Sequence, residues 1–259
     1  MIIRYAKSEH EKTFEELFGD NIFVRHDGRA IPCIILAFVN RSGSNYLAEL
    51  LRSTGRFAGF GECLNAPNVK YLAPRYGVNS LEGYLSRHRQ EDVKSSGQMW
   101  GLKAGWMQLA MLLRTGAIPK LLQPTLVSIR RRDLIGQAIS LFIAEQTLQW
   151  KSTEDAVSAR EKVAYDGNAI LAHFRGLAES YVKVEQVVAL SNCPYQQIYY
   201  EDLMDSPQST IAKLTGALVG NELSPLLDAV QIKIQRDEVS EKFKLRFLAE
   251  MQQIKWDVL

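Results

Sequence analysis

The residues best suited to chemistry lie in a short polar loop that follows an apolar run. The run covers residues 33–39, and the string NRSGS occupies residues 40–44. Arg41 carries a planar fork of donors that fits phosphate or sulfate oxygens. Gly43 lets the backbone approach a ligand closely because no Cβ intrudes, and Ser42 and Ser44 add hydroxyls on either side of it. The loop is predicted to bind an anion, although a plain βα turn with one surface arginine remains open.

The order of residues in this loop argues against an ATP site of the Walker type. That site needs the pattern G-x-x-x-x-G-K-[ST], which is absent from the segment. Here the cation, Arg41, precedes a single glycine. A strand, a small polar loop and a helix nevertheless point free backbone N–H groups and the positive end of a helix at an anion.

Two more candidate side chains follow neighbouring predicted strands. Glu62 ends a short strand within residues 56–65, and Lys103 lies in a third strand within residues 99–106. Strand ends meet at the ligand crevice of an open α/β sheet, so Glu62 is expected near Arg41. A carboxylate beside an anion site suggests proton transfer, and Lys103 is suited to neutralise a transferring group. A solvated carboxylate and a surface lysine are the alternatives.

A second basic cluster follows the predicted strand at residues 125–129. The string RRRD occupies residues 130–133, and Ser140 lies one or two turns into the next predicted helix. This arrangement can hold a second phosphate. Three consecutive arginines cannot all face one ligand, so Arg130 or Arg132 is expected to form ordinary ion pairs. Two anion sites on separate strand–helix units suggest 3′-phosphoadenosine 5′-phosphosulfate (PAPS), which has phosphates at both ends, better than ATP.

The elements that must position these residues can be read from the apolar periodicity. A buried strand precedes the first loop, and apolar residues from Tyr46 to Leu51 mark a helix that Gly55 ends. A long amphipathic helix is predicted over residues 163–190 and a strand over 195–200. A helix begins at Ser206-Pro207, and a last one is expected over 243–251. Residues 66–98 are heterogeneous, are interrupted by Pro67, Pro74 and Gly77, and are interpreted as a substrate wall or lid.

These elements predict one α/β domain over residues 1–259, with a P-loop-like central parallel sheet flanked by helices on both faces. The chain has 259 residues, 46% of them hydrophobic, and a net charge of +2 that argues against nucleic-acid binding. Its three cysteines suggest neither a disulfide framework nor a zinc site, and no metal is expected. No signal peptide or membrane-length apolar run is visible, so a cytoplasmic location is expected. The pattern leaves open whether the chain forms a homodimer.

Several strings together resemble a known family. They are R-S-G-S, G-E-C-L-N, the block L-V-S-I-R-R-R-D-L-I-G-Q-A-I-S-L-F with Q-T-L-Q-W after it, Tyr165-Asp166, and Tyr200-Glu201-Asp202-Leu203. The family is the PAPS-dependent carbohydrate sulfotransferases of bacteria, of the trehalose 2-sulfotransferase and the nodulation-factor and lipopolysaccharide sulfotransferase types. The resemblance covers most of the chain from Ile31 onward.

The resemblance implies a role for each matching position. Arg41, Ser42, Gly43, Ser44, Asn45 and Tyr46 would hold the 5′-phosphosulfate, Arg131 and Ser140 the 3′-phosphate, and Glu62 would be the catalytic base. Arg236 could reach the nucleotide. Two positions depart from the family pattern, because Asn45 stands where Thr is common and Arg132 where Pro or Asn is common.

The implied activity is transfer of a sulfuryl group from PAPS to a hydroxyl of a carbohydrate or glycolipid acceptor, so the expected partner is a small molecule or a glycolipid. Two other classes remain open. One is a P-loop kinase or nucleotide hydrolase, which the missing lysine after the loop disfavours. The other is a non-catalytic module that binds a glycan or 3′-phosphoadenosine 5′-phosphate (PAP), which the presence of Glu62 disfavours.

Overall fold

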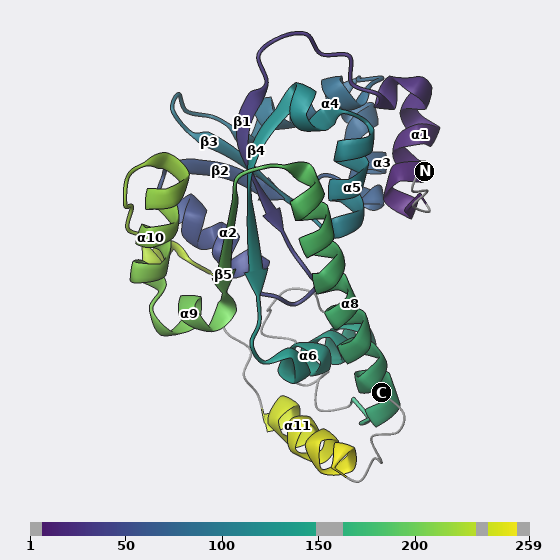
Figure 1. Cartoon of the computed structure of the whole chain (residues 1–259), viewed down its shortest axis with the longest axis vertical. Coiled ribbons are helices and arrows are strands. Elements are labelled where there is room, and N and C mark those ends of the chain that lie inside the picture. Colours follow the sequence, from purple (N-terminus) through teal and green to yellow (C-terminus); the bar gives the residue numbers. More distant parts are fainter. Residues whose placement is uncertain (1–6, 149–162, 232–237, 253–259) are drawn as a thin grey trace.

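The computed structural model describes residues 7–148, 163–231 and 238–252. Within these ranges the chain forms a five-stranded sheet in the order β2-β3-β1-β4-β5 (Figure 1). Every neighbouring pair in this sheet is parallel. The strands are β1 (Ile31–Ala37), β2 (Phe57–Gly61), β3 (Met99–Ala104), β4 (Leu122–Arg130) and β5 (Tyr195–Tyr199). The α/β fold with a central parallel sheet that the sequence predicts is confirmed.

Strand β1 shows why both faces of the sheet are covered. Residues 33–37 are all buried, and successive side chains point to opposite faces of a strand. Cys33, Ile35 and Ala37 join one hydrophobic core, and Ile34 and Leu36 join the other. A strand buried on both sides reads as a continuous apolar run, as residues 33–37 do.

Helices surround the sheet on both sides. Figure 1 shows α5 and α8 on one side of the sheet and α2 and α10 on the other. The described helices are α1 (Glu9–Phe18), α2 (Ser44–Ser53), α3 (Ala66–Tyr76), α4 (Leu81–Asp92), α5 (Trp106–Arg114), α6 (Leu134–Thr147), α8 (Gly167–Ser191), α9 (Tyr200–Asp205), α10 (Pro207–Val219) and α11 (Glu238–Met251), with short helical turns η1 (Gly19–Ile22), η2 (Ala117–Leu121) and η3 (Leu227–Ala229). None of these described helices is both long and apolar enough to cross a membrane.

The segment interpreted as a substrate wall or lid contains two helices that help to build the core. Val69 and Ala73 of α3 and Tyr84 and Leu85 of α4 are buried in the same cluster as β1. Pro67 lies in the first turn of α3, where a missing N–H costs no hydrogen bond, so it starts the helix instead of breaking it.

The parallel arrangement gathers the carboxyl ends of all strands at one edge of the sheet. The loop after β1, Glu62 after β2, the turn after β3 and the arginines after β4 therefore share this edge. In Figure 1 it is the lower edge, beside α6. Strand β1 lies between β3 and β4, so the anion loop has one candidate cluster on each side.

Candidate active site

The loop between β1 and α2 turns tightly through two residues with a positive φ. Arg41 has φ 61°, and Gly43 has φ 93° and ψ 14° at the N-cap of α2. A Cβ on Gly43 would lie 2.3 Å from Cδ2 of Tyr200, so only glycine fits beneath that ring. Ser44 then begins α2 and is buried. The loop thus leads into the N-terminus of α2, and a helix N-terminus has free backbone N–H groups and favours negative charge.

Arg41, Ser140 and Arg131 meet beside this loop. The Nε of Arg41 donates a hydrogen bond of 3.0 Å to Oγ of Ser140 on α6. The Nη1 of Arg131 donates a long one of 3.5 Å to the carbonyl oxygen of Arg41. The strand–helix unit of β1 and that of β4 therefore present their arginines and hydroxyls to one place.

Two donors in this cluster are buried without an acceptor. Ser42 Oγ and Arg131 Nε have no hydrogen-bond partner in the part of the chain that the structure describes, and Ser42 is fully buried. Buried polar groups are normally paired, because an unpaired one loses its hydration with no compensation. Phosphate or sulfate oxygens would supply the missing acceptors, so this chemistry fits an anionic ligand such as PAPS.

A second layer of hydrogen bonds joins the two units behind the cluster. Arg131 N donates to the hydroxyl of Tyr181 (3.2 Å), which donates to Oε1 of Gln137 (2.9 Å). The Nε2 of Gln137 donates to the carbonyl oxygen of Asn40 (2.7 Å). Gln137 is fully buried. This series holds the loop after β4 against the loop after β1.

Tyr200 is a site residue to which sequence reasoning gave no role of its own. Its ring covers Gly43, and the guanidinium of Arg131 lies 4.6 Å from the ring centroid, within the range of a cation–π contact. The one available signal was an aromatic residue at the end of a predicted strand, directly before Glu201 and Asp202. Tyr46, half-buried on the first turn of α2, lies close enough to Tyr200 for their phenol groups to interact, and burial raises the pKa of Tyr46.

The other two arginines of the basic cluster bind acidic side chains, as the sequence predicts. Arg130 pairs with Glu185 on α8. Arg132 forms a fork of two hydrogen bonds with Asp202, at 2.7 and 3.0 Å. Of the three consecutive arginines, Arg131 is the one that reaches the loop after β1.

Glu62 and Lys103 form an ion pair on the other side of β1. The distance from Lys103 Nζ to Glu62 Oε1 is 2.6 Å, and the lysine side chain is 4% exposed against 33% for the glutamate. Lys103 Nζ also donates to Oδ1 of Asn45, and the ring of Phe38 lies 5.3 Å away. The alternative of a surface lysine is therefore wrong. Lys103 links the anion loop to the carboxylate.

The second oxygen of Glu62 also has a partner. Asn65 Nδ2 donates a 2.6 Å hydrogen bond to Glu62 Oε2. The structure thus brings together Arg41, Asn45, Glu62, Lys103, Arg131 and Ser140, whereas Arg236 lies outside the described residues. The described residues contain no group of three or more His, Cys, Asp or Glu that could hold a metal ion.

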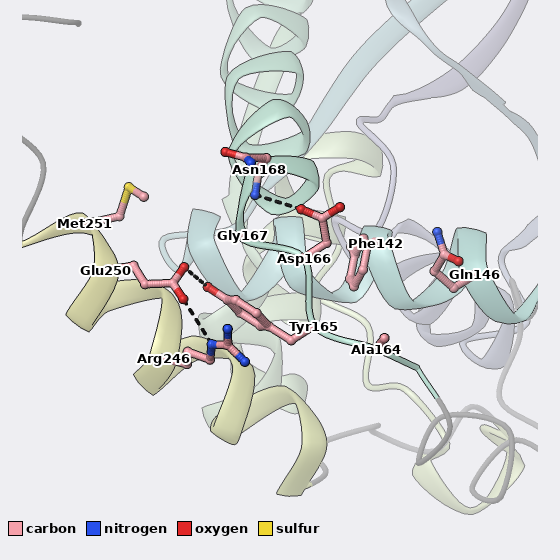
Figure 2. Close-up of a pocket in the computed structure, with 10 residues that line it drawn as sticks. All are labelled: Phe142, Gln146, Ala164, Tyr165, Asp166, Gly167, Asn168, Arg246, Glu250 and Met251. Carbon is pink, nitrogen blue, oxygen red and sulfur yellow. Dashed lines mark hydrogen bonds and ion pairs between the residues drawn. The ribbon is translucent and has the colours of Figure 1, made fainter.

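Tyr165 and Asp166, which belong to the resemblance, line a separate pocket of about 610 Å³ (Figure 2). Figure 2 shows the Tyr165 hydroxyl on Glu250 Oε2 (2.6 Å) and Arg246 Nε on Glu250 Oε1 (3.0 Å). Asp166 accepts from the backbone N–H of Asn168 at the start of α8. These polar groups satisfy one another. The α6 residues that line the pocket also lie on a different face of that helix from Ser140.

Comparison with known proteins gives a family and a fold. The family described as Stf0 sulphotransferase matches residues 33–250. Among solved structures, the sulfotransferase domain of the Synechococcus PCC 7002 olefin synthase is 12% identical, with a TM-score of 0.50, and the match covers 92% of this chain and 93% of that one.

The sulfotransferase domain of the curacin biosynthetic pathway is 14% identical, with a TM-score of 0.46 and coverage of 86% and 99%. The sulfotransferase of Alicyclobacillus acidocaldarius is 12% identical, with a TM-score of 0.45 and coverage of 86% and 94%. The curated proteins contain no match to this chain. Because the family match spans most of the sequence, from the first buried strand to the last helix, the chain belongs to the Stf0 sulphotransferase family.

Proposed function

We propose that this protein transfers a sulfuryl group from PAPS to a hydroxyl of a carbohydrate or glycolipid acceptor. The observation that carries the proposal is the meeting of Arg41, Ser140 and Arg131, beside two buried donors, Ser42 Oγ and Arg131 Nε, for which the described residues supply no acceptor. Clusters borne on two separate strand–helix units suit a ligand with phosphates at both ends. Membership of the sulphotransferase family supports the same chemistry.

The donor would be held by the residues of both units. Arg41, Ser42, Gly43, Ser44, Asn45 and Tyr46 would hold the 5′-phosphosulfate at the start of α2, and Arg131 and Ser140 the 3′-phosphate. Arg236 is proposed to reach the nucleotide as well. When bound, PAPS supplies an activated sulfuryl group on a phosphate leaving group. The hydrogen bond between Arg41 and Ser140 supports the two phosphate sites being neighbours.

Glu62 is proposed as the general base. It accepts the proton that the acceptor hydroxyl loses while the hydroxyl oxygen replaces the phosphate oxygen on sulfur, and the departing phosphate keeps the bonding electron pair. Lys103 would stabilise negative charge on the leaving phosphate, and its contacts with Glu62 and Asn45 support this role. A positioned base of this kind contributes roughly 10²–10⁴-fold to the rate.

We also propose a reducing, cytoplasmic setting for the reaction. Cys33, Cys63 and Cys193 are all free thiols, and proteins of oxidising compartments more often pair their cysteines. Both the donor PAPS and the acceptor would then have to be present in the cytoplasm.

The experiment that tests the function is incubation with PAPS and a panel of glycans, glycolipids and small metabolites that includes trehalose. Mass spectrometry should detect an acceptor that has gained a sulfuryl group, with release of an equal amount of PAP. Tight PAP binding without any transfer would instead indicate a non-catalytic module. Tighter binding of ATP with magnesium than of PAP would indicate a kinase or nucleotide hydrolase.

Glu62→Gln tests the base. The variant keeps an acceptor oxygen for Lys103 and is expected to bind PAP normally, while turnover falls at least tenfold. The matched control is Glu91→Gln on the exposed surface of α4, where the carboxylate pairs with Arg87, and it should retain turnover. Near-normal turnover of the Glu62 variant would remove Glu62 from the mechanism.

A further inference from the structure

Two amide side chains form a directed series of hydrogen bonds that ends on the Glu62 carboxylate. The backbone N–H of Gly105 donates to Gln108 Oε1 (2.7 Å). Gln108 Nε2 donates to Asn65 Oδ1 (2.6 Å), and Asn65 Nδ2 donates to Glu62 Oε2 (2.6 Å). We propose that Gln108 is a positioning residue that sets the direction of the Asn65 amide and thereby holds Glu62 as an ionised, oriented carboxylate. The catalytic meaning of this role rests on the function proposed above.

The direction of the series follows from its first member. A backbone N–H can only donate, so Gln108 must turn its oxygen toward Gly105 and its nitrogen toward Asn65. Asn65 must then turn its oxygen toward Gln108 and its nitrogen toward Glu62. A protonated Glu62 that donated to Asn65 would reverse both amides, and Gly105 opposes that reversal. The series therefore favours the charged carboxylate, the form that a base needs.

The anchor of the series is rigid. Gln108 is 3% exposed and lies in the first turn of α5, where its Oε1 accepts from the backbone N–H of the N-cap residue Gly105. Because an unpaired amide is costly at such a buried position, both ends of the Gln108 side chain must keep their partners. Gln108 therefore has one orientation, and it imposes one on Asn65.

The side chain of Asn65 does not cap the helix that begins after it. Asn65 is the N-cap residue of α3, yet its side chain makes no cap hydrogen bond. An asparagine cap normally accepts from the backbone N–H of the second or third residue of the helix. Here the second residue is Pro67, which has no N–H, and the N–H of the first residue, Ala66, donates to Nδ1 of His10 on α1 (3.1 Å). The side chain of Asn65 instead bonds Gln108 and Glu62.

The β3–α5 unit controls both oxygens of the carboxylate. Lys103 at the end of β3 holds Oε1 directly, and Gln108 at the start of α5 holds Oε2 through Asn65. The backbone carbonyl of Glu62 accepts in addition from Asn65 N (3.1 Å) and from Asn68 Nδ2 (2.7 Å). The carboxylate cannot rotate without breaking one of these contacts.

The test follows the Glu62 side chain by carboxyl ¹³C NMR across a pH titration, with the resonance assigned by its loss in Glu62→Gln. Asn65→Leu removes the donor to Oε2, so the midpoint of the Glu62 titration should rise by about one pH unit. Gln108→Met, which conserves volume, should raise it in the same direction and by no more. The double variant should match Asn65→Leu alone, because Gln108 acts only through Asn65.

An unchanged midpoint in Gln108→Met, or a double variant whose shift is the sum of the single shifts, would overturn the proposal. Gln108→Glu is a second variant that keeps the acceptor for Gly105 and reverses the Asn65 amide, so it should shift the midpoint further upward. Gln123→Met, at the exposed start of β4 at the opposite sheet edge, is the control and should leave it unchanged. PAP affinity should stay within about twofold of the parent in all variants, which reports that they fold.

This titration separates the two proposals. It measures the hydrogen-bond series in the free protein and needs no acceptor. If the Glu62 titration midpoint does not change in Gln108→Met while Glu62→Gln has low turnover, the positioning role alone is refuted. Normal turnover of Glu62→Gln together with the expected shifts would refute the base and leave the series intact.

Discussion

Replacement of Gly43 by alanine is the sharpest test of the anion loop. The added Cβ would lie 2.3 Å from Cδ2 and 2.8 Å from Cε2 of Tyr200. Contacts this short cannot be tolerated, so either the ring or the loop must move. The ring also stacks against the guanidinium of Arg131 at 4.6 Å, so a displaced ring would release Arg131 from its place beside Arg41.

The magnitude has two parts. A side chain in the left-handed conformation at φ 93° costs about 1–2 kcal/mol, and the lost stacking of Arg131 on Tyr200 adds about 0.5–1 kcal/mol. A loss of about 1.5–3 kcal/mol lowers the melting temperature of a domain of this size by roughly 3–12 °C. If the shifted loop also loses one charged hydrogen bond to PAP, affinity falls by about 1.5–3 kcal/mol, or roughly tenfold to more than a hundredfold.

Calorimetric titration with PAP and thermal denaturation measure the two parts separately. Gly55→Ala is the matched control, because Gly55 also has a positive φ, 75°, but nothing lies within 4 Å of its added Cβ. The control should lose stability from its backbone conformation and keep PAP affinity. A Gly43→Ala protein that bound PAP as tightly as the control and melted at the same temperature would refute the assigned loop geometry.

Three further outcomes are expected. Arg41→Ala should weaken PAP binding by about 1.5–3 kcal/mol, and unchanged affinity in calorimetry would count against the loop assignment. Burial by itself would raise the pKa of Asp133, but hydrogen bonds from Lys244 and from a backbone N–H outweigh it and lower the pKa. The resulting stability is complete above the ordinary pKa of 3.8 and is lost as the pH falls through the lowered value, so in urea titrations Asp133→Asn should be less stable than the parent at pH 7 and approach it in acid. Burial raises the pKa of Cys33 to about 12, so iodoacetamide at pH 8 should modify the half-exposed Cys193 first, and earlier peptide labelling at Cys33 would contradict this.

The parts of the fold that could be predicted are those that local pattern encodes. The apolar run at residues 33–39 marks β1 because a strand covered on both faces needs no polar positions. Ser206 and Pro207 mark the start of α10, and Gly220 marks its end with a positive φ. The convergence of Arg41 and Arg131 was predictable for another reason, since parallel strands gather their carboxyl ends.

The parts that could not be predicted depend on distant partners. Lys103 is charged in a short strand, and nothing near it in sequence shows that it is buried. Lys103 is buried because it lies opposite Leu36 of the central strand and pairs with Glu62, 41 positions away. Asn65 and Gln108 are likewise joined over 43 positions. A single sequence contains no local signal for such pairs.

The prolines of residues 66–98 misled in a different way. Pro67 and Pro74 suggested an irregular segment, yet Pro67 lies in the first turn of α3 and Pro74 near its end. Proline at a helix start is favoured because its N–H would have no partner there, so the same residue can mark either a loop or a helix. The buried residues of the segment, such as Tyr84, show that tertiary packing decides between the two.

Strand β1 is central in the order β2-β3-β1-β4-β5, so the candidate site has two sides. Glu62 and Lys103 lie on the side of β2 and β3, Arg131 and Ser140 lie on the side of β4, and the loop after β1 contacts both. Substitutions along β2 and β3 can reshape the surroundings of Glu62 while the arginine–serine contact on the β4 side keeps its geometry. On the proposed function, selectivity for the acceptor could therefore change through substitutions near Glu62 while the contacts to the donor are kept. Asn45, at the start of α2, accepts a hydrogen bond from Lys103. A substitution at this position would therefore affect both sides of the site.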